Sequence, residues 1–297
     1  MAPTLGRHRL PPGRADTRTV VSTRARDWAE IQERMLVPLY EAVYERLEVR
    51  AGTRVLGLGC GSGLALLLAA ARGARVTGVD ADQERLALAR ERLLADRERD
   101  GEDRPAGTGT VLPADRIAEA AAAAAAAEAA TEPGRPPYDL ITAFQPIGTV
   151  AGDAKGLAPA LDSAIPLVEH GAPVVLAGWG PPERCATYAL LRVAGRPADR
   201  LREDARRPVR RDDLEDVAAR AGLEPDGSGR VACPFGYADT ESAVRGLLST
   251  GVFDKAIRAT DRQQVEKEIG EALQPHLRPD GTVWMPNVFR YLIARTP

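Results

Sequence analysis

Apolar and polar positions divide most of the chain into short strands and amphipathic helices. An apolar run over 54–58 is too short for a helix and glycines end it at once, which predicts a buried strand. A helix over 64–72 and a second strand ending at Asp80 follow it. The same patterns predict further helices over 83–95, from 115 through the alanine run 120–127, 153–169, 214–221, 239–249 and 261–274, and further strands near 110–112, 138–144, 172–178, 229–235 and 284–294.

The residues before the first strand carry two different patterns. Residues 1–21 contain prolines and arginines without periodicity, and we expect a disordered tail there. From Trp28 to Leu47 apolar residues recur at near-helical spacing, which predicts a lid helix over about 25–48 with a kink near Pro38. A helix in this position can cover a site at the edge of the sheet.

The turn between the first strand and its helix contains Gly57, Gly59, Gly61 and Gly63. Glycine allows backbone conformations that a side chain would forbid, and it lets a ligand lie against bare main chain. The free N–H groups at the start of the next helix point toward such a ligand. Asp80 ends the second strand, where ribose hydroxyls need an acceptor in a nucleotide site of this kind. These features predict a nucleotide-type ligand.

The spacing within the turn argues against two common nucleotide loops. Counted from Gly57 or Gly59, the sixth positions are Ser62 and Leu64, where a dinucleotide fingerprint needs glycine or alanine, and this disfavours NAD. A phosphate-binding loop ends in Gly-Lys-Ser/Thr, and no lysine occurs before Lys155, which excludes ATP bound in that way.

The turn GLGCGSG and the following GVDAD resemble the S-adenosylmethionine loop of class I methyltransferases. The wider chain, over about 28–295, resembles a family of bacterial small-molecule methyltransferases. This resemblance implies an α/β fold. In that fold, a Rossmann-like doubly wound sheet of seven mostly parallel strands carries an N-terminal helical lid and an inserted cap. It also implies S-adenosylmethionine as cofactor and methyl transfer to an oxygen, nitrogen or carbon atom of a small apolar or aromatic metabolite. The segments that carry it are WAEIQERMLVPLYEAV (28–43), LALARERL (86–93), YDLITAF (138–144), VVLAGWGPPERC (174–185), CPFGYADTESAVRGLLSTG (233–251) and PDGTVWMPNVFRYLIAR (279–295).

The resemblance places the cofactor in the first half of one domain. We expect this domain over 22–297, with a cofactor half at 50–150 and a substrate-facing half with the cap at about 179–285. Two of the implied cofactor residues have other interpretations, since Asp115 fits the N-cap of the alanine helix and Cys60 fits either a reactive thiol or a small space-filling residue. The full set is Gly57, Gly59, Cys60, Gly61, Gly63, Asp80, Ala81, Asp115 and Phe144.

One position departs from the family's pattern. Family members carry an acid where this chain has Gly57, and that carboxylate helps to hold the cofactor's amino group. None of the three histidines lies where a catalytic base is needed. Glu183 and Tyr237 are the remaining candidates for a base, and a substrate that is already nucleophilic needs none. The glycine and the lack of a base leave an alternative open, a methyltransferase-like cyclase or isomerase that binds the cofactor without transferring methyl.

Aromatic residues indicate where a substrate binds. All of them lie at 28–44 or 138–291, and none lies between 45 and 137. Ligands in such folds lie beyond the carboxyl ends of the strands, which makes Phe144 and Trp179 the strongest candidates. For each candidate, the alternative is that the side chain packs in the core or lies at the surface without contacting a substrate. The substrate-binding set is Trp28, Tyr40, Phe144, Trp179, Tyr237, Arg245, Trp284 and Asn287, with Arg290 as a further polar anchor.

Composition narrows the class of protein. A net charge of −2 gives no global field that attracts nucleic acid or membranes, and the arginine-rich stretch 195–213 has mixed signs typical of a solvated connector. Three cysteines without C-x-x-C spacing favour a reducing compartment and argue against zinc. We therefore expect a cytoplasmic protein with a small-molecule substrate and no metal, nucleic-acid or membrane partner. The sequence leaves the oligomeric state open.

Overall fold

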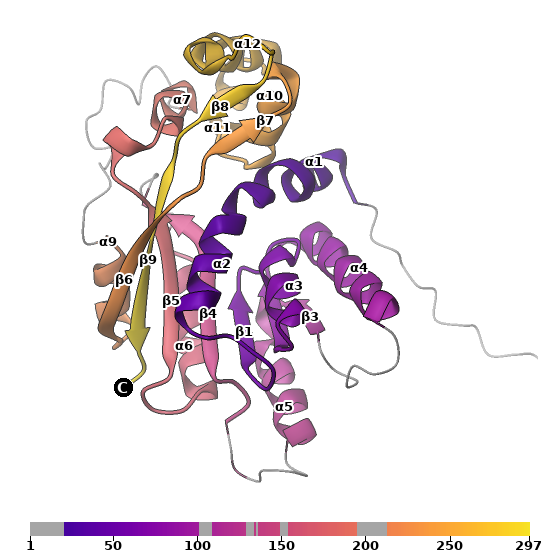
Figure 1. Ribbon diagram of the computed structural model, residues 1–297, viewed down its shortest axis with the longest axis vertical. Coiled ribbons are helices and arrows are strands. Elements are labelled where there is room, and N and C mark those ends of the chain that lie inside the picture. The colour runs from indigo at the N-terminus through magenta and orange to yellow at the C-terminus, as the bar shows by residue number, and fades with distance from the viewer. Residues whose placement is uncertain (1–20, 101–108, 129–133, 135, 149–153, 195–212) are drawn as a thin grey trace, which may run out of the picture.

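Seven strands form the central sheet of the protein, in the order β3-β2-β1-β4-β5-β9-β6 (Figure 1). Strands β1 to β5 run parallel, and β9 is antiparallel to its neighbours β5 and β6. This sheet confirms the predicted doubly wound α/β fold. The strands are β1 (Arg54–Leu58), β2 (Arg75–Asp80), β3 (Gly109–Pro113), β4 (Leu140–Ile147), β5 (Pro173–Trp179), β6 (Glu224–Ala232) and β9 (Val288–Arg295).

The computed structural model describes most of the chain. The expected tail at 1–21 and the arginine-rich stretch 195–213 lie outside the described residues, apart from the last residue of each. The described ranges are 21–100, 109–128, 134, 136–148, 154–194 and 213–297.

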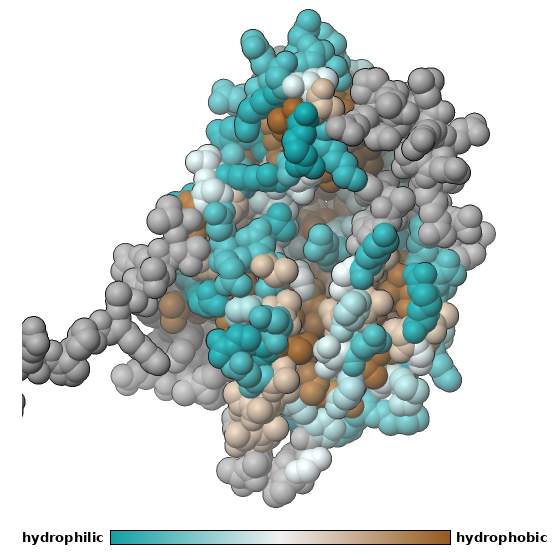
Figure 2. Space-filling view, turned by 180° about the vertical axis from the view of Figure 1, so that it is seen from behind, coloured by the Kyte–Doolittle hydropathy of each residue, from teal (hydrophilic) through white to brown (hydrophobic). Residues whose placement is uncertain are grey.

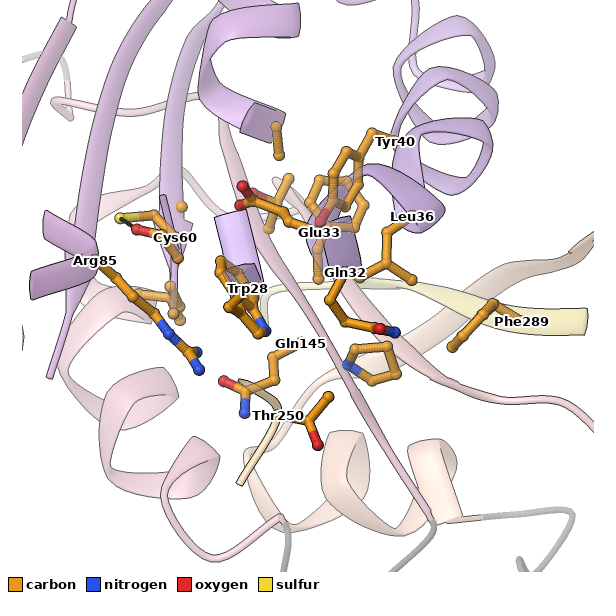
Figure 3. A pocket seen from close by; sticks show the side chains of 18 of the residues that line it. Trp28, Gln32, Glu33, Leu36, Tyr40, Cys60, Arg85, Gln145, Thr250 and Phe289 are labelled. Atoms are coloured by element: carbon orange, nitrogen blue, oxygen red, sulfur yellow. Dashed lines mark hydrogen bonds between the residues drawn. The ribbon is translucent and has the colours of Figure 1, made fainter. Parts of the chain in front are cut away.

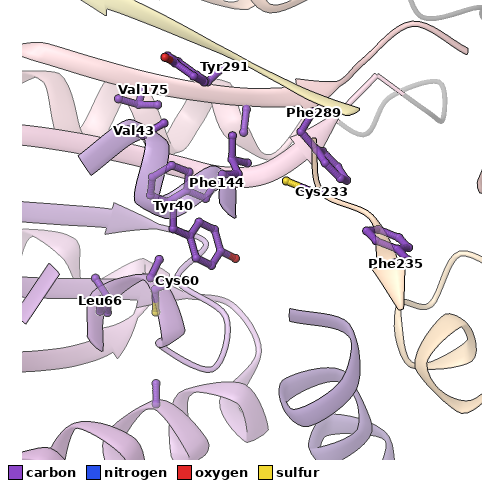
Figure 4. Packing of buried hydrophobic residues seen from close by; sticks show 14 of the residues in the cluster. Tyr40, Val43, Cys60, Leu66, Phe144, Val175, Cys233, Phe235, Phe289 and Tyr291 are labelled. Atoms are coloured by element: carbon purple, nitrogen blue, oxygen red, sulfur yellow. The ribbon is translucent and has the colours of Figure 1, made fainter. Parts of the chain in front are cut away.

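Helices cover both faces of the sheet because alternate strand residues point to opposite sides. Val175 and Ala177 of β5 belong to one buried cluster, and Val174 and Leu176 belong to the other. Figure 4 shows part of the first cluster, in which Tyr40 packs beside Phe144. The first face is covered by α2 (Val37–Arg46), α3 (Leu64–Ala71) and α4 (Gln83–Asp100), and the second by α5 (Ile117–Glu128), α6 (Leu157–Ala164) and α9 (Asp213–Arg220).

A cap, residues 235–285, is inserted between β6 and β9 and lies above one end of the sheet (Figure 1). Its two short strands, β7 (Phe235–Tyr237) and β8 (Val283–Met285), pair with each other as a separate antiparallel sheet. Seen from behind, hydrophilic side chains cover much of the cap (Figure 2). Its helices are α10 (Thr240–Ser249), α11 (Asp254–Ala259) and α12 (Arg262–Leu273), and α7 (Thr187–Ala194) lies beside them.

The N-terminal segment is helical but irregular. In place of one kinked helix it forms α1 (Thr23–Asp27), a π-helical turn η1 (Trp28–Gln32), a 3-10 turn η2 (Glu33–Leu36) and then α2. The break precedes Pro38, which lies in the first turn of α2 and has no N–H to continue an α-helical ladder. Ala29, Gln32 and Glu33 of these two distorted turns are buried.

Some predicted boundaries are wrong in the C-terminal half. Strand β6 begins at Glu224, five residues before the predicted start, and the predicted final strand is divided into β8 and β9 around Pro286. The predicted helix over 153–169 is shorter and ends in a 3-10 turn at Ile165–Leu167. Helices α7 and α11 were not predicted.

Candidate functional site

The glycine turn adopts a backbone that only glycine takes readily. Gly59, Gly61 and Gly63 have φ angles of 61°, 58° and 79°, in the left-handed region where other residues are strained. A Cβ on Gly63 would lie 2.9 Å from the Cβ of Ala89, so Gly63 also permits close contact between α3 and α4. The turn therefore presents bare main chain at Gly59 and Gly61.

Asp80 is held at the carboxyl end of β2 by backbone N–H groups. It is 8% exposed; its Oδ2 accepts a hydrogen bond from the N–H of Gly61 at 2.8 Å and its Oδ1 accepts one from the N–H of Asp82 at 2.9 Å. These bonds fix the carboxylate between the turn and the start of α4. Each oxygen can accept a second hydrogen bond, so Asp80 keeps acceptor capacity for a ligand hydroxyl.

Two adjoining cavities open at the carboxyl ends of β1, β2 and β4. The first, which we call the aromatic cavity, has a volume of about 230 Å³. The second, the Asp80 cavity, has a volume of about 530 Å³ and is lined by Asp80, Ala81 and Asp115 among others. Gly59 and Gln145 line both cavities, which therefore meet at the glycine turn.

Aromatic rings from six elements of the fold line the aromatic cavity (Figure 3). Phe144 of β4 packs against Tyr40 of α2, with ring centroids 4.9 Å apart. Trp179 of β5 packs against Phe289 of β9 at 4.6 Å and against Phe235 of β7 at 5.9 Å. The structure thus brings Tyr40, Phe144 and Trp179, three of the predicted substrate residues, to one cavity.

Trp28 covers the glycine turn from the N-terminal segment. A Cβ on Gly61 would collide with the Trp28 ring, and the Arg85 guanidinium lies 4.0 Å from the ring centroid. Both Trp28 and Arg85 line the aromatic cavity (Figure 3). Trp28 therefore lies on a lid over the turn, as the sequence predicts for it.

Sequence reasoning missed several polar residues of the aromatic cavity, among them Gln32, Glu33 and Gln145. Gln32 and Glu33 come from the distorted N-terminal turns, and Gln145 comes from β4. Gln32 accepts a hydrogen bond from the Tyr237 hydroxyl at 3.0 Å. Burial raises the pKa of Glu33, although hydrogen bonds to its carboxylate act in the opposite direction. A helical pattern alone does not distinguish inward polar residues such as Gln32 and Glu33 from solvated ones. Gln145 directly follows Phe144 in β4, so its place near the end of the strand was the signal that could have found it.

Two predicted polar anchors pair with acids instead of lining the aromatic cavity. Arg245 of α10 contacts Asp27 at the end of α1, with an N–O distance of 3.1 Å. Arg290 of β9 donates a hydrogen bond to Glu215 of α9 at 2.9 Å. Their positions do not support the expectation that they anchor a substrate, because both ion pairs tie elements of the fold together.

Two further candidates lie away from the aromatic cavity. Asn287 is buried, and its Oδ1 accepts a hydrogen bond from the N–H of Thr187 at 3.2 Å, which ties the start of α7 to β9. Trp284 is 40% exposed, with the Arg278 guanidinium 4.5 Å from its ring centroid. Neither position supports the expected substrate contact.

The Cys60 side chain packs inside the fold. Cys60 is 8% exposed, and a Cβ on Gly78 of β2 would lie 2.8 Å from its Sγ. Burial raises the pKa of the Cys60 thiol, and the charges of Asp80 and Glu33 add to this effect. The position favours the space-filling interpretation over the reactive thiol.

We expect Cys60 to resist thiol reagents in the folded protein, because the thiolate is the reacting species and the thiol is buried. The other two cysteines are buried as well. Labelling with a chromogenic disulfide should therefore be slow in buffer and reach three thiols per chain only in denaturant. Rapid labelling of Cys60, located by peptide mass spectrometry, would show that the turn opens in solution.

The described part of the chain contains no cluster of three or more histidine, cysteine, aspartate or glutamate side chains that could hold a metal ion. None of its helices combines the length and apolar character that crossing a membrane requires.

Comparison with known proteins identifies a domain type. Residues 22–226, more than half of the chain, match the family model of a methyltransferase domain. No curated protein sequence matches the chain.

Solved structures with a similar chain trace have low sequence identity. The protein YjhP of E. coli is 19% identical, over 92% of this chain and 98% of that chain, with a TM-score of 0.49. A SAM-dependent methyltransferase from Thiobacillus denitrificans, solved with S-adenosyl-L-homocysteine, is 18% identical over 89% and 92%, with a TM-score of 0.47. The 4+2 cyclase SpnF is 16% identical over 87% and 80%, with the same TM-score of 0.47.

Proposed function

Because the chain belongs to the methyltransferase-domain family and S-adenosylmethionine is its cofactor, we propose that it methylates a small apolar or aromatic metabolite. The accepting atom is an oxygen, nitrogen or carbon. The observation that carries this proposal is the aromatic cavity, which meets the Asp80 cavity at Gly59 and Gln145.

The residues at the strand ends fit the parts of the cofactor. Asp80 offers acceptor capacity to ribose hydroxyls, and Asp115 lines the same cavity, where it suits the adenine amino group. The bare main chain of Gly59 and Gly61 suits the amino-acid end. When bound, the cofactor supplies an electrophilic methyl group on its sulfonium.

The aromatic cavity suits a flat or apolar substrate. Trp179, Phe235 and Phe289 form its wall on the side of β5, β9 and the cap, while Phe144 and Tyr40 form the wall beside the glycine turn. Such walls exclude water and restrict the orientation of a bound ring. Gln145, at the junction of the two cavities, is the polar group best placed to orient the accepting atom.

Neither predicted base lies at this junction. Glu183 is exposed in a surface groove beside α7. Tyr237 is buried with its hydroxyl bonded to Gln32, and burial raises its pKa above the ordinary range. We therefore propose that the substrate is already nucleophilic and that catalysis depends on positioning.

Mass spectrometry tests this proposal against the alternative. The protein is incubated with S-adenosylmethionine carrying an isotopically labelled methyl group and with a panel of small aromatic and apolar metabolites. Transfer of the label to one metabolite, with matching formation of S-adenosylhomocysteine, supports methyl transfer. A rearranged product of unchanged mass would instead favour the cyclase or isomerase.

The Trp179→Ala variant should lose turnover by about ten- to a hundredfold and keep cofactor affinity within about twofold, because the ring restricts substrate orientation. Trp284→Ala is the matched control, since Trp284 is exposed and lies outside the aromatic cavity. Steady-state kinetics and calorimetric titration with S-adenosylhomocysteine measure the two effects. Equal loss of cofactor binding in Trp179→Ala would assign the ring to the cofactor site.

We also propose that the protein acts in the cytoplasm. Cys60, Cys185 and Cys233 are all free and buried, which suits a reducing compartment. Thiol quantification on protein isolated from cells under alkylating conditions tests this.

A further inference from the structure

The buried carboxylate of Glu33 lies beside the glycine turn. Glu33 is 2% exposed and lines the aromatic cavity. A Cβ on Gly61 would lie 2.9 Å from its Oε1, so this oxygen faces the bare main chain of the turn. In Figure 3 the Glu33 side chain lies among those of the cavity, with Trp28 and Tyr40 also drawn.

Neighbouring groups fix the other carboxylate oxygen. Oε2 accepts hydrogen bonds from the Ser62 hydroxyl and from Nη1 of Arg92, the latter at 2.9 Å. The same Arg92 nitrogen donates to the Ser62 carbonyl at 3.0 Å. Arg92 and Ser62 thus hold Glu33 in one position, which is what a binding group needs before its ligand arrives.

Charge in the aromatic cavity is sparse. Among its described lining residues, Glu33 is the single carboxylate and Arg85 the single cation. Arg85 lies over the Trp28 ring and also pairs with Asp82, with an N–O distance of 3.4 Å. A cationic ligand group at the turn would therefore meet the Glu33 carboxylate, whose Oε2 pairs with Arg92 while Oε1 lies toward the turn. The low dielectric of such a site strengthens the attraction.

The turn itself provides no acid. Residues 57–63 contain none, and Asp80 already accepts hydrogen bonds from Gly61 and Asp82. A primary ammonium at the turn would find backbone carbonyls and Glu33.

We propose that Glu33 binds the α-ammonium group of the cofactor's amino-acid end. The proposal rests on the proposed function, since it assumes S-adenosylmethionine in the adjoining cavities. The carboxylate comes from the N-terminal segment, where the π-helical and 3-10 turns place Glu33 inward. Cofactor binding is then linked to closure of this segment over the turn.

Calorimetric titration with two ligands tests the assignment. One ligand is S-adenosylhomocysteine and the other is its analogue lacking only the α-amino group. The parent protein should prefer S-adenosylhomocysteine by about ten- to a hundredfold, the size of a charge-assisted hydrogen bond. In Glu33→Gln this preference should fall by about tenfold, because the amide carries no charge to attract the ammonium, while the backbone carbonyls remain.

Two further variants distinguish loss of the ammonium contact from a general loss of cofactor affinity. Asp80→Asn should weaken both ligands alike and keep the preference, because both ligands carry the same ribose. Glu33→Asp keeps the charge and should retain part of the preference, and it decides the matter if Glu33→Gln fails to fold in thermal melts.

The outcomes distinguish a failure of the proposed function from a failure of the Glu33 assignment. If the parent binds neither ligand, the proposed function fails. If the parent prefers S-adenosylhomocysteine and folded Glu33→Gln keeps that preference or weakens both ligands equally, the ammonium assignment is overturned. Glu33 would then be a structural partner of Arg92, or a contact of a substrate amine.

Discussion

Asp80→Ala should lower the affinity for S-adenosylmethionine by about ten- to a hundredfold, or on the order of 1.5–3 kcal/mol. Two causes act together. The variant loses the acceptor for ribose hydroxyls, and it releases the N–H groups of Gly61 and Asp82 that the carboxylate holds at 2.8 and 2.9 Å. Isothermal titration calorimetry measures the affinity.

Asp80→Asn keeps the size of the side chain and one acceptor oxygen while removing the charge, so its loss of affinity should be smaller than that of Asp80→Ala. Asp162→Asn is the control, because Asp162 is an exposed carboxylate on α6 that lines neither cavity. Unchanged affinity in Asp80→Ala, in a protein with the parent's melting temperature, would contradict the ribose role.

The cofactor half of the fold follows closely from local sequence. The predicted elements 54–58 and 64–72 agree with β1 and α3 to within one residue, and the predicted second strand ends at Asp80 as β2 does. Each signal there is local, because an apolar run too short for a helix ends at glycines whose positive φ stops the strand.

Strand β6 shows why the C-terminal half of the fold is harder to predict from the sequence. It begins Glu-Pro-Asp-Gly, which reads as a loop. The segment is nevertheless a strand, because β9 supplies its hydrogen-bond partners, starting from the pair Glu224 and Arg295. An edge strand tolerates proline and glycine, so the pairing across the sheet overrides local preference.

The residues of the candidate site also divide into those that local sequence predicts and those that it does not. Asp80, Phe144 and Trp179 could be predicted because each lies at or near the carboxyl end of a strand, and such ends meet at one edge of a parallel sheet. Glu33 and Arg245 could not be placed, because both lie in helical segments where orientation depends on tertiary contacts. Glu33 is buried beside the turn, and Arg245 pairs with Asp27, which lies far away in the sequence.

Gly57→Asp should destabilise the protein by about 3 kcal/mol or more, because an unpaired carboxylate would be buried. A Cβ at position 57 would lie 3.0 Å from Cδ2 of Leu66, and its nearest polar neighbour within 4 Å is Oγ1 of Thr142 at 3.7 Å. The added carboxylate would also share the aromatic cavity with Glu33, so like charges would repel. Urea unfolding measures the loss.

Gly57→Ala is the matched control for the carboxylate. Gly57 has no positive φ, and the flexible end of Leu66 can shift by a few tenths of an ångström, so alanine should cost only about 1 kcal/mol. The difference between the two variants isolates the buried charge. If Gly57→Asp were instead as stable as Gly57→Ala and bound S-adenosylmethionine more tightly than the parent, the ammonium group would lie beside position 57. That result would contradict its assignment to Glu33, because a second carboxylate gains affinity only where the cation is within reach.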